Sequence, residues 1–183
     1  MMIRKIFSLT TVLTLACGLS SCGVDHGQQH GPLSMGASDG EIENTICSVA
    51  QESNAVADMV INTSDASLWI TAVNPVRKKE WESSRAMASV IGADSLGLYG
   101  WGNEDLENPE TKRIVDSLSD ISGSFEVPAG RTAIVAIEGV VSPAAQKAEV
   151  SQMQVSYKKD PASEKSATVV GNIRYEWDAN SCD

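Results

Sequence analysis

From residue 41 onward, the chain contains short runs in which hydrophobic and polar residues alternate with a period of two. The alternation occurs at 153–157 and 169–177, and it is typical of β-strands, while residues 68–73 predict a strand that is covered on both faces. Residues 132–141 are almost continuously apolar, which predicts a central strand. Further short runs bring the count to about seven strands. We therefore expect a mainly β fold, an antiparallel β-sandwich or a barrel-like sheet.

The connections between these runs contain turn-forming residues. Asn62-Thr63-Ser64-Asp65 separates apolar positions at 57–61 from the run at 68–73, which predicts a hairpin. Gly171 interrupts the last alternating run and is expected to form a β-bulge. The Val-Pro-Ala-Gly-Arg-Thr turn at 127–132 is similar to turns in many bacterial Ig-like sandwich domains. This resemblance covers only the turn and implies an Ig-like form of the sandwich.

Residues 74–122 break the β pattern and predict a helical excursion between strands. Asn74-Pro75 is a helix start signal, and Gly92 is a stop signal. Four apolar residues between them share one helical stripe: Trp81, Met87, Ala88 and Ile91. Asn108-Pro109 repeats the start signal and predicts a second helix that ends before Gly123.

The first 21 residues follow a different pattern. Arg4 and Lys5 precede an uncharged stretch at 6–19. Its apolar centre is too short to span a bilayer comfortably, since a spanning helix needs about 20 apolar residues. A basic start, an apolar centre and small residues before a cut are the layout of an export signal. An ordinary signal peptide or a short hydrophobic anchor would share these features.

Leu19-Ser20-Ser21-Cys22, followed by Gly23, resembles the lipobox of bacterial lipoproteins. The resemblance covers residues 1–23, and no family is recognised for the rest of the chain. It implies that Cys22 receives a diacylglyceryl group, that the chain is cut before it, and that the new amine is acylated, with palmitate as the expected label. Several acyl chains are needed, because a single chain anchors only marginally. The implied location is the outer membrane, on its periplasmic or surface side.

These observations divide the chain into a signal peptide (1–21), a lipidated cysteine with a flexible tether (22–40) and a folded domain (41–183). Glycine recurs in the tether, and Pro32 interrupts it, which is typical of a flexible linker. His26 and His30 are spaced as a metal-binding pair on a helix would be, but the neighbouring glycines argue against a helix. We interpret both histidines as part of a spacer and expect no metal site.

The net charge argues against a nucleic-acid partner. The chain has 14 basic and 24 acidic residues, a formal charge of −10. The predicted cut removes Arg4 and Lys5 but no acidic residue, which makes the charge −12. Such a surface repels phosphates, and no basic patch offsets it.

The cysteines predict one disulfide. Cys17 leaves with the signal peptide and Cys22 takes the lipid, so Cys47 and Cys182 remain in an exported domain. An oxidising compartment favours a bond between them, with Cα atoms about 5.5–6 Å apart. Two free thiols are the alternative.

The folded domain contains no histidine, because both histidines lie in the tether. A Ser-His-Asp triad, a Cys-His pair and histidine metal sites are therefore excluded. The sequence also lacks GxSxG, a P-loop and GxGxxG, so we expect no cofactor. A pair of carboxylates stays open, because such pairs are defined by their spacing in the fold.

The most distinctive internal sequence is Gly97-Leu98-Tyr99-Gly100-Trp101-Gly102. Flanking glycines favour an exposed loop, where Tyr99 and Trp101 would contact a sugar ring or a protein partner. The alternative is that both rings fold back over the core, because large aromatic side chains are usually buried.

Three functions are compatible with the sequence. The first is a lipid-anchored, non-catalytic domain that binds a protein or glycan at the cell envelope. The second is a small envelope hydrolase that uses carboxylates, which a deep cleft with two facing carboxylates would favour. The third is a membrane-active β-sandwich of the aegerolysin or actinoporin type, which an exposed belt of Trp and Tyr would favour. Whether the domain is an enzyme stays open, and the first function is preferred.

Overall fold

The structure is a computed structural model that describes residues 31–36, 42, 44–92 and 97–182. The predicted lipobox, Cys22, His26 and His30 lie outside the described residues. Within this part of the chain there are fourteen strand segments, one 3-10 helix and one α-helix. No helix in these ranges has the length and apolar character needed to cross a membrane.

One layer of the fold is sheet A. Its strands follow the order β1 (Leu33–Met35), β3 (Asn54–Asn62), β10 (Thr132–Val141), β6 (Trp81–Ile91) and β8 (Ser119–Asp120), and β7 (Gly100–Gly102) also pairs with β3. The predicted central strand at 132–141 is confirmed, because β10 lies between β3 and β6. All of these pairings are antiparallel.

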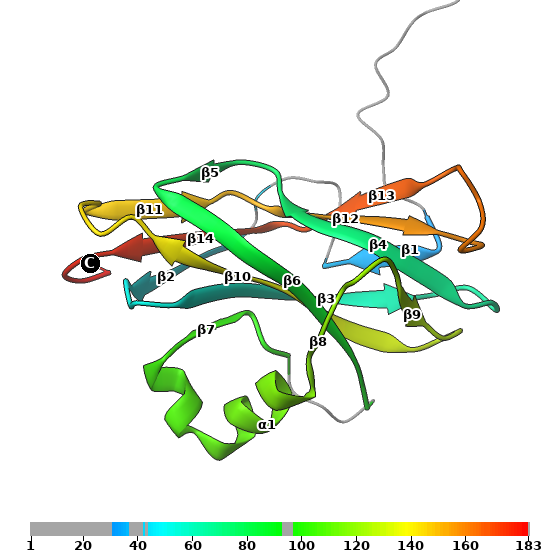
Figure 1. The fold of residues 1–183 in the computed structure, drawn as a ribbon, viewed down its shortest axis with the longest axis horizontal. Coiled ribbons are helices and arrows are strands. Elements are labelled where there is room, and N and C mark those ends of the chain that lie inside the picture. The colour runs from blue at the N-terminus through cyan, green and yellow to red at the C-terminus, as the bar shows by residue number, and fades with distance from the viewer. Residues whose placement is uncertain (1–30, 37–41, 43, 93–96, 183) are drawn as a thin grey trace, which may run out of the picture.

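The second layer consists of sheets B and C. Sheet B has the order β2 (Asn44–Val49), β14 (Ile173–Asp178), β11 (Lys147–Val150) and β5 (Lys78–Lys79). Sheet C has the order β13 (Ala167–Val170), β12 (Met153–Lys158), β4 (Leu68–Pro75) and β9 (Phe125–Val127). Chain segments pass from one sheet to the other at 76–77, 151–152 and 171–172, where Val76 donates to Gln152 O (2.8 Å) and Ser151 donates to Arg77 O (3.0 Å). Sheets B and C are therefore two halves of one bent layer (Figure 1).

The antiparallel β-sandwich is confirmed, and the parallel pair β2–β14 is the exception to its antiparallel pairing in the described chain. The predicted number of about seven strands was too low, because the long strands break where the second layer bends. Gly171 lies at such a break and not at a bulge within one strand: its N–H donates to Met153 O (2.9 Å), while β13 and β14 belong to different sheets.

The main core fills the space between the two layers. Trp81 of sheet A stacks on Trp177 of sheet B, with ring centroids 5.9 Å apart and ring planes within 4°. Next to this pair, the register between β10 and β6 shifts between Glu138 and Gly139, where Ser84 of β6 is bulged. A Cβ atom at Gly139 would overlap the Trp81 ring, so the glycine is required by this close approach.

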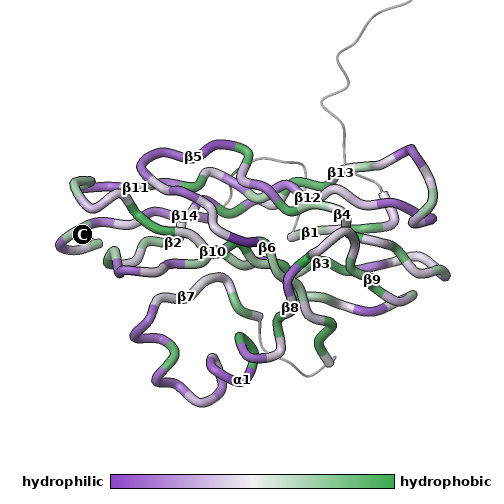
Figure 2. Tube along the Cα trace, viewed as in Figure 1, coloured by the Kyte–Doolittle hydropathy of each residue, from purple (hydrophilic) through white to green (hydrophobic). Residues whose placement is uncertain are grey.

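A second core covers the outer face of sheet A. The 3-10 helix η1 (Glu104–Glu107) and helix α1 (Pro109–Ser117) lie against this face (Figure 1). Asn108 caps α1, since its side chain accepts from the N–H groups of Glu110 (2.9 Å) and Thr111 (3.3 Å). The helix predicted from Asn108-Pro109 is confirmed. Figure 2 shows hydrophilic residues on α1 and on the exposed β5, at opposite sides of the molecule.

The helix predicted from Asn74-Pro75 is wrong, because residues 81–91 form strand β6. Sheet A is covered on both faces, so β6 has buried residues on both: Trp81 and Ala88 belong to the main core, Met87 and Ile91 to the outer one. A bulge within β6, at Ser84, changes which alternate positions of this strand face the main core. The resulting spacing of apolar residues imitates a helical stripe.

The hairpin predicted for 57–61 and 68–73 is also wrong. The two strands, β3 and β4, belong to different layers, and the connection between them is an arch. Asn62, which is fully buried, holds this arch: its Nδ2 donates to Ala66 O (2.9 Å) and Val127 O (2.9 Å). A turn between two paired strands would not need these hydrogen bonds. The arch joins strands of different layers, and the Asn62 side chain provides the hydrogen bonds that hold it.

The predicted tether extends too far. Leu33 and Met35 are fully buried, and β1 pairs with β3 from Leu33↔Asn62 to Met35↔Val60. The alternation of two apolar residues after Pro32 is a short strand signal that the glycine-rich surroundings obscure. A flexible tether is therefore excluded for residues 33–35.

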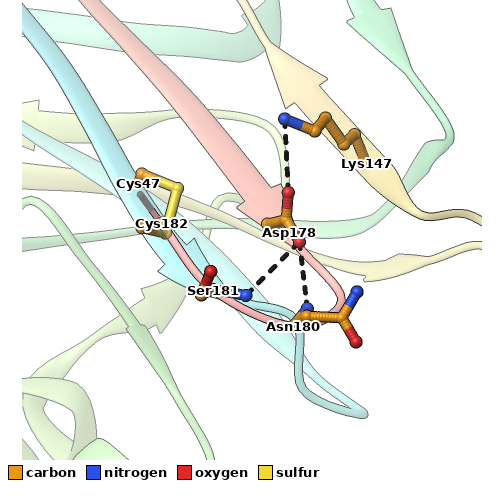
Figure 3. Close-up of a disulfide and its surroundings, with 6 residues drawn as sticks. All are labelled: Cys47, Lys147, Asp178, Asn180, Ser181 and Cys182. Atoms are coloured by element: carbon orange, nitrogen blue, oxygen red, sulfur yellow. Dashed lines mark hydrogen bonds and ion pairs between the residues drawn. A yellow bond between two sulfur atoms is a disulfide. The ribbon is translucent and has the colours of Figure 1, made fainter.

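The predicted disulfide is confirmed. Cys47 and Cys182 are bonded, with Cα atoms 5.7 Å apart and a sequence separation of 135. Figure 3 shows how the chain returns to β2: Asp178 Oδ1 accepts from the backbone N–H groups of Asn180 (3.0 Å) and Ser181 (3.4 Å). The Asn180 N–H, more than nearby Lys147, lowers the pKa of Asp178. Both cysteines are exposed.

Candidate ligand-binding groove

The sandwich is open along the edge where β3 faces β2 and β14. On this edge β3 has two short partners, because β7 pairs with residues 54–56 and β1 pairs with residues 60–62. Residues 57–59 lie between these partners. Two cavities open along this edge, and we call them together the edge groove. They share Ile46 and Tyr99 in their walls.

The first cavity, the Trp101 pocket, has a volume of about 270 Å³. It lies between β2, β7 and β14, and its aromatic walls are Tyr99, Trp101, Tyr175 and Trp177. The sequence predicted that Tyr99 and Trp101 are both exposed. Tyr99 is 42% exposed, as predicted, but Trp101 is 6% exposed and belongs to the outer core, as in the alternative interpretation.

The glycines around these aromatic residues allow the backbone of residues 100–102 to pack closely against neighbouring segments. Gly100-Trp101-Gly102 forms β7, and an added Cβ at Gly100 would lie 2.6 Å from Ala55 O. A Cβ at Gly102 would overlap the side chain of Gln51. The glycines thus bring β7 close to β3, and residues 100–102 of the predicted exposed loop form a paired strand, which η1 follows.

The second cavity, the Asp58 pocket, has a volume of about 590 Å³, which is within the usual range for small-molecule sites. Its apolar walls come from both layers: Met59 and Ile61 from β3, Ile46 from β2 and Ile173 from β14. Its polar groups include Asn44, Thr45 and Asn172. Tyr99 forms part of the wall between this pocket and the Trp101 pocket.

Asp58 is the buried acid of this pocket, with 3% of its surface exposed. Its Oδ1 accepts from the N–H of Met59 (2.7 Å), which points to the open edge of β3. Oδ2 accepts no hydrogen bond from any described residue. Burial raises the pKa of Asp58 to about 6, against a usual 3.8, and the Met59 N–H opposes this only in part.

Tyr175 closes the inner end of the edge groove. Its hydroxyl donates to Ala57 O (2.6 Å), so sheet B is tied to β3 at the groove edge, where the Ala57 N–H donates to Tyr99 O (3.1 Å). Burial raises the pKa of Tyr175, and the negative charge of Asp58 and the nearby Tyr99 raise it further. Asp58, Tyr99 and Tyr175 therefore lie close enough to interact electrostatically.

The other carboxylates of the edge groove are Asp105 and Glu176, and both line the Trp101 pocket. Asp105 accepts from the Gly102 N–H (2.7 Å), which stabilises the turn after β7. Among the described residues, no group of three or more potential ligands could hold a metal ion.

The aromatic side chains form no belt on the described surface. Trp81, Trp101 and Trp177 are buried, and Tyr157 and Tyr175 are buried as well. Trp69 and Phe125 are half-buried, and among the described aromatic residues Tyr99 alone is exposed. The arrangement that would favour a membrane-active sandwich is therefore not present in this part of the chain.

Sequence reasoning missed Asp58, Ile46 and Asn172 as parts of a site. A charged residue inside the otherwise apolar run at 55–60 was the one available signal for Asp58. Ile46 and Asn172 had no signal, because their place in the groove depends on the parallel pairing of β2 with β14.

No protein-family model matches the chain, and the search of curated proteins found no match. Solved structures with a similar outline include an ASH/PapD-like domain of human CEP192, with 8% identity and a TM-score of 0.39 over 98% of this chain and 99% of that one. The adhesive subunit CfaE of the enterotoxigenic Escherichia coli CFA/I fimbria gives 9% identity and 0.35, over 82% and 50%. The collagen-binding subdomain of the Enterococcus faecalis surface protein ACE gives 12% and 0.27, over 73% and 93%.

Proposed function

We propose that this chain is a lipid-anchored lipoprotein of the bacterial cell envelope and that its β-sandwich is a non-catalytic domain that binds a protein or glycan. The observation that carries the binding role is the edge groove, where exposed Tyr99 stands between two cavities with aromatic and apolar walls. An exposed aromatic ring at the mouth of a preformed cavity suits contact with a sugar ring or a protein side chain.

The position of β1 supports an anchored arrangement. Because β1 is buried from Leu33, a chain lipidated at Cys22 would have a tether of residues 23–30 only. Fully extended, the path from Cys22 to Gly31 spans at most about 30 Å. From the anchor, the chain enters the domain at Pro32, whose carbonyl accepts from the Thr63 N–H (2.8 Å), and it reaches the Asp58 pocket at Gly36, directly after β1. The ligand would then be met close to the membrane, with the outer membrane as the proposed location.

The binding role is tested by photo-crosslinking in living cells. A benzophenone amino acid replaces Tyr99 in one variant and Val140, an exposed residue outside the groove, in the matched control. We expect position 99 to crosslink a defined protein or glycan and position 140 to lack that product. Identical products at both positions, or none at position 99, would contradict a binding site at Tyr99.

The anchor is tested separately by Cys22→Ala. The variant should incorporate no labelled palmitate and should be uncut or miscut at the signal peptide. Continued incorporation of palmitate into the variant would show that Cys22 is not the lipidated residue.

A further inference from the structure

The charge on Asp58 is not needed by the fold around it. The structural task of its side chain is to accept the Met59 N–H at the open edge of β3, at 2.7 Å from Oδ1. The amide oxygen of an asparagine would accept the same hydrogen bond without carrying a charge. Instead, the chain has a carboxylate that is 3% exposed and whose second oxygen accepts no hydrogen bond from a described residue.

Nothing in the described pocket neutralises this charge. The titratable groups that face Asp58 are the phenols of Tyr99 and Tyr175, and the described lining contains no Lys, Arg or His. An isolated buried carboxylate is costly unless a cation or several donors approach it. Among the described residues, Oδ2 therefore has no positively charged partner, and a ligand could supply one.

The rest of the Asp58 pocket determines the shape of such a ligand. Around Asp58 the walls are Met59 and Ile61 on one side and Ile46 and Ile173 on the other, which suits an alkyl stem. The Tyr99 ring adds an aromatic surface, to which cations are attracted. A cation reaching Asp58 would be held by charge at its head and by apolar contact along its stem.

We infer that the Asp58 pocket binds an organic cation, an ammonium or guanidinium group on an apolar stem, with the cationic nitrogen donating to Asp58 Oδ2. Both a lysine or arginine side chain of a polypeptide and a free alkylamine have this chemistry. The inference rests on the proposed binding function and deepens it, because it names the chemical class that the Asp58 end of the groove recognises.

The test uses the full-length protein and three probes, with binding followed by the shifts of amide resonances in two-dimensional NMR. N-acetyl-lysine amide carries the cation, N-acetyl-norleucine amide has a similar stem without it, and n-butylamine is the free amine. We expect the lysine probe to shift the amide resonances of Met59 and Ile173 in a saturable way. The norleucine probe should bind at least about tenfold more weakly, a difference that corresponds to about 1.4 kcal/mol in binding free energy. Equal binding of the two amides, or no shifts with millimolar lysine probe, would overturn the inference.

Two variants locate the effect. Asp58→Asn should weaken the lysine probe at least about tenfold, while Asp65→Asn, which removes the same charge from an exposed loop, should not. Lowering the pH from 7.5 to 5 should also weaken binding about tenfold, because a carboxyl with a pKa of about 6 is then mostly protonated. Unchanged affinity in Asp58→Asn would overturn the inference.

The remaining comparisons distinguish a polypeptide side chain from a free amine as the ligand, and they distinguish failure of the cation inference from failure of the proposed binding function. Tighter binding of the lysine amide than of n-butylamine assigns the pocket to a polypeptide side chain, and the reverse assigns it to a free amine; each supports recognition of a cation. If no cation binds but position 99 still gives its specific crosslink, the cation inference fails and the proposed binding function stands. If cations bind and position 99 gives no crosslink, the proposed function fails at Tyr99 while the Asp58 chemistry stands.

Discussion

Replacing the buried carboxyl of Asp58 by an amide should stabilise the protein at neutral pH. Its pKa is about 6 in the folded protein and 3.8 when unperturbed, and a difference of one in pKa corresponds to about 1.4 kcal/mol. Holding the charge in the folded state therefore costs about 3 kcal/mol above pH 6. Asp58→Asn should remove this cost, since the amide oxygen still accepts the Met59 N–H and the side chain keeps its size.

The direction of the pH dependence follows from which state binds the proton more tightly. Between pH 3.8 and about 6, folded Asp58 holds a proton that the unfolded chain has released. The contribution of Asp58 to stability therefore falls as the pH rises through this window, and it is constant above it. The stability gap between Asp58→Asn and the wild type should be about 3 kcal/mol at pH 7.5 and less than about 1 kcal/mol at pH 4.

Urea unfolding monitored by tryptophan fluorescence measures this gap, with the disulfide intact. For a urea slope of about 1–3 kcal/mol per molar, the midpoint of Asp58→Asn should move up by at least about 1 M at pH 7.5. Asp65→Asn, which is exposed, provides the control for the change in net charge and should show no comparable shift. An Asp58→Asn variant that is less stable than the wild type at pH 7.5, or a gap that does not shrink toward pH 4, would refute the reasoning.

Two further predictions concern the framework. Reduction of the Cys47–Cys182 disulfide, which closes a loop with a sequence separation of 135, should destabilise the fold by about 5 kcal/mol in the chain-entropy model. The melting temperatures with and without reductant should then differ by about 10–20 °C. A difference of only a few degrees would argue against a stabilising role of the disulfide. Gly139→Ala should lower the free energy of unfolding in urea by more than about 2 kcal/mol, because the new Cβ would overlap the Trp81 ring. The control Val140→Ala changes an exposed side chain and should lower it by less than about 1 kcal/mol. Equal losses in the two variants would contradict the packing argument.

The sequence predicted well those elements whose signals are local. β10 was recognisable because residues 132–141 are buried on both faces of sheet A, and α1 was recognisable because Asn108 caps its own helix. The disulfide was predictable because the lipobox and the signal peptide account for the other two cysteines. For β10 and α1, the residues that decide the prediction are neighbours in the chain. For the disulfide, the prediction depends on the expected export of the protein.

The failures occurred where tertiary contacts determine the pattern. Residues 81–91 looked helical because β6 is buried on both faces and contains a bulge at Ser84, opposite Glu138/Gly139, after which the alternate positions change faces. The predicted hairpin after β3 failed because Asn62 supports an arch between layers with bonds to Val127 and Pro128, which lie far along the chain. Asp58 was missed as a site residue because its environment is formed by β2 and β14, more than 100 residues apart in sequence.

Strand β2 connects the stability of the domain to the geometry of the edge groove. Most of β2 is exposed, and its described strand partner is β14, so burial of its side chains contributes little to its position. The disulfide fixes this strand at Cys47, one residue from Ile46, which lines both pockets. The cross-link therefore acts in two ways: it restricts the unfolded chain, and it keeps one wall of the groove beside β14. A domain that holds an uncompensated charge on Asp58 at neutral pH can tolerate that cost of about 3 kcal/mol because a cross-link of about 5 kcal/mol stabilises the same edge.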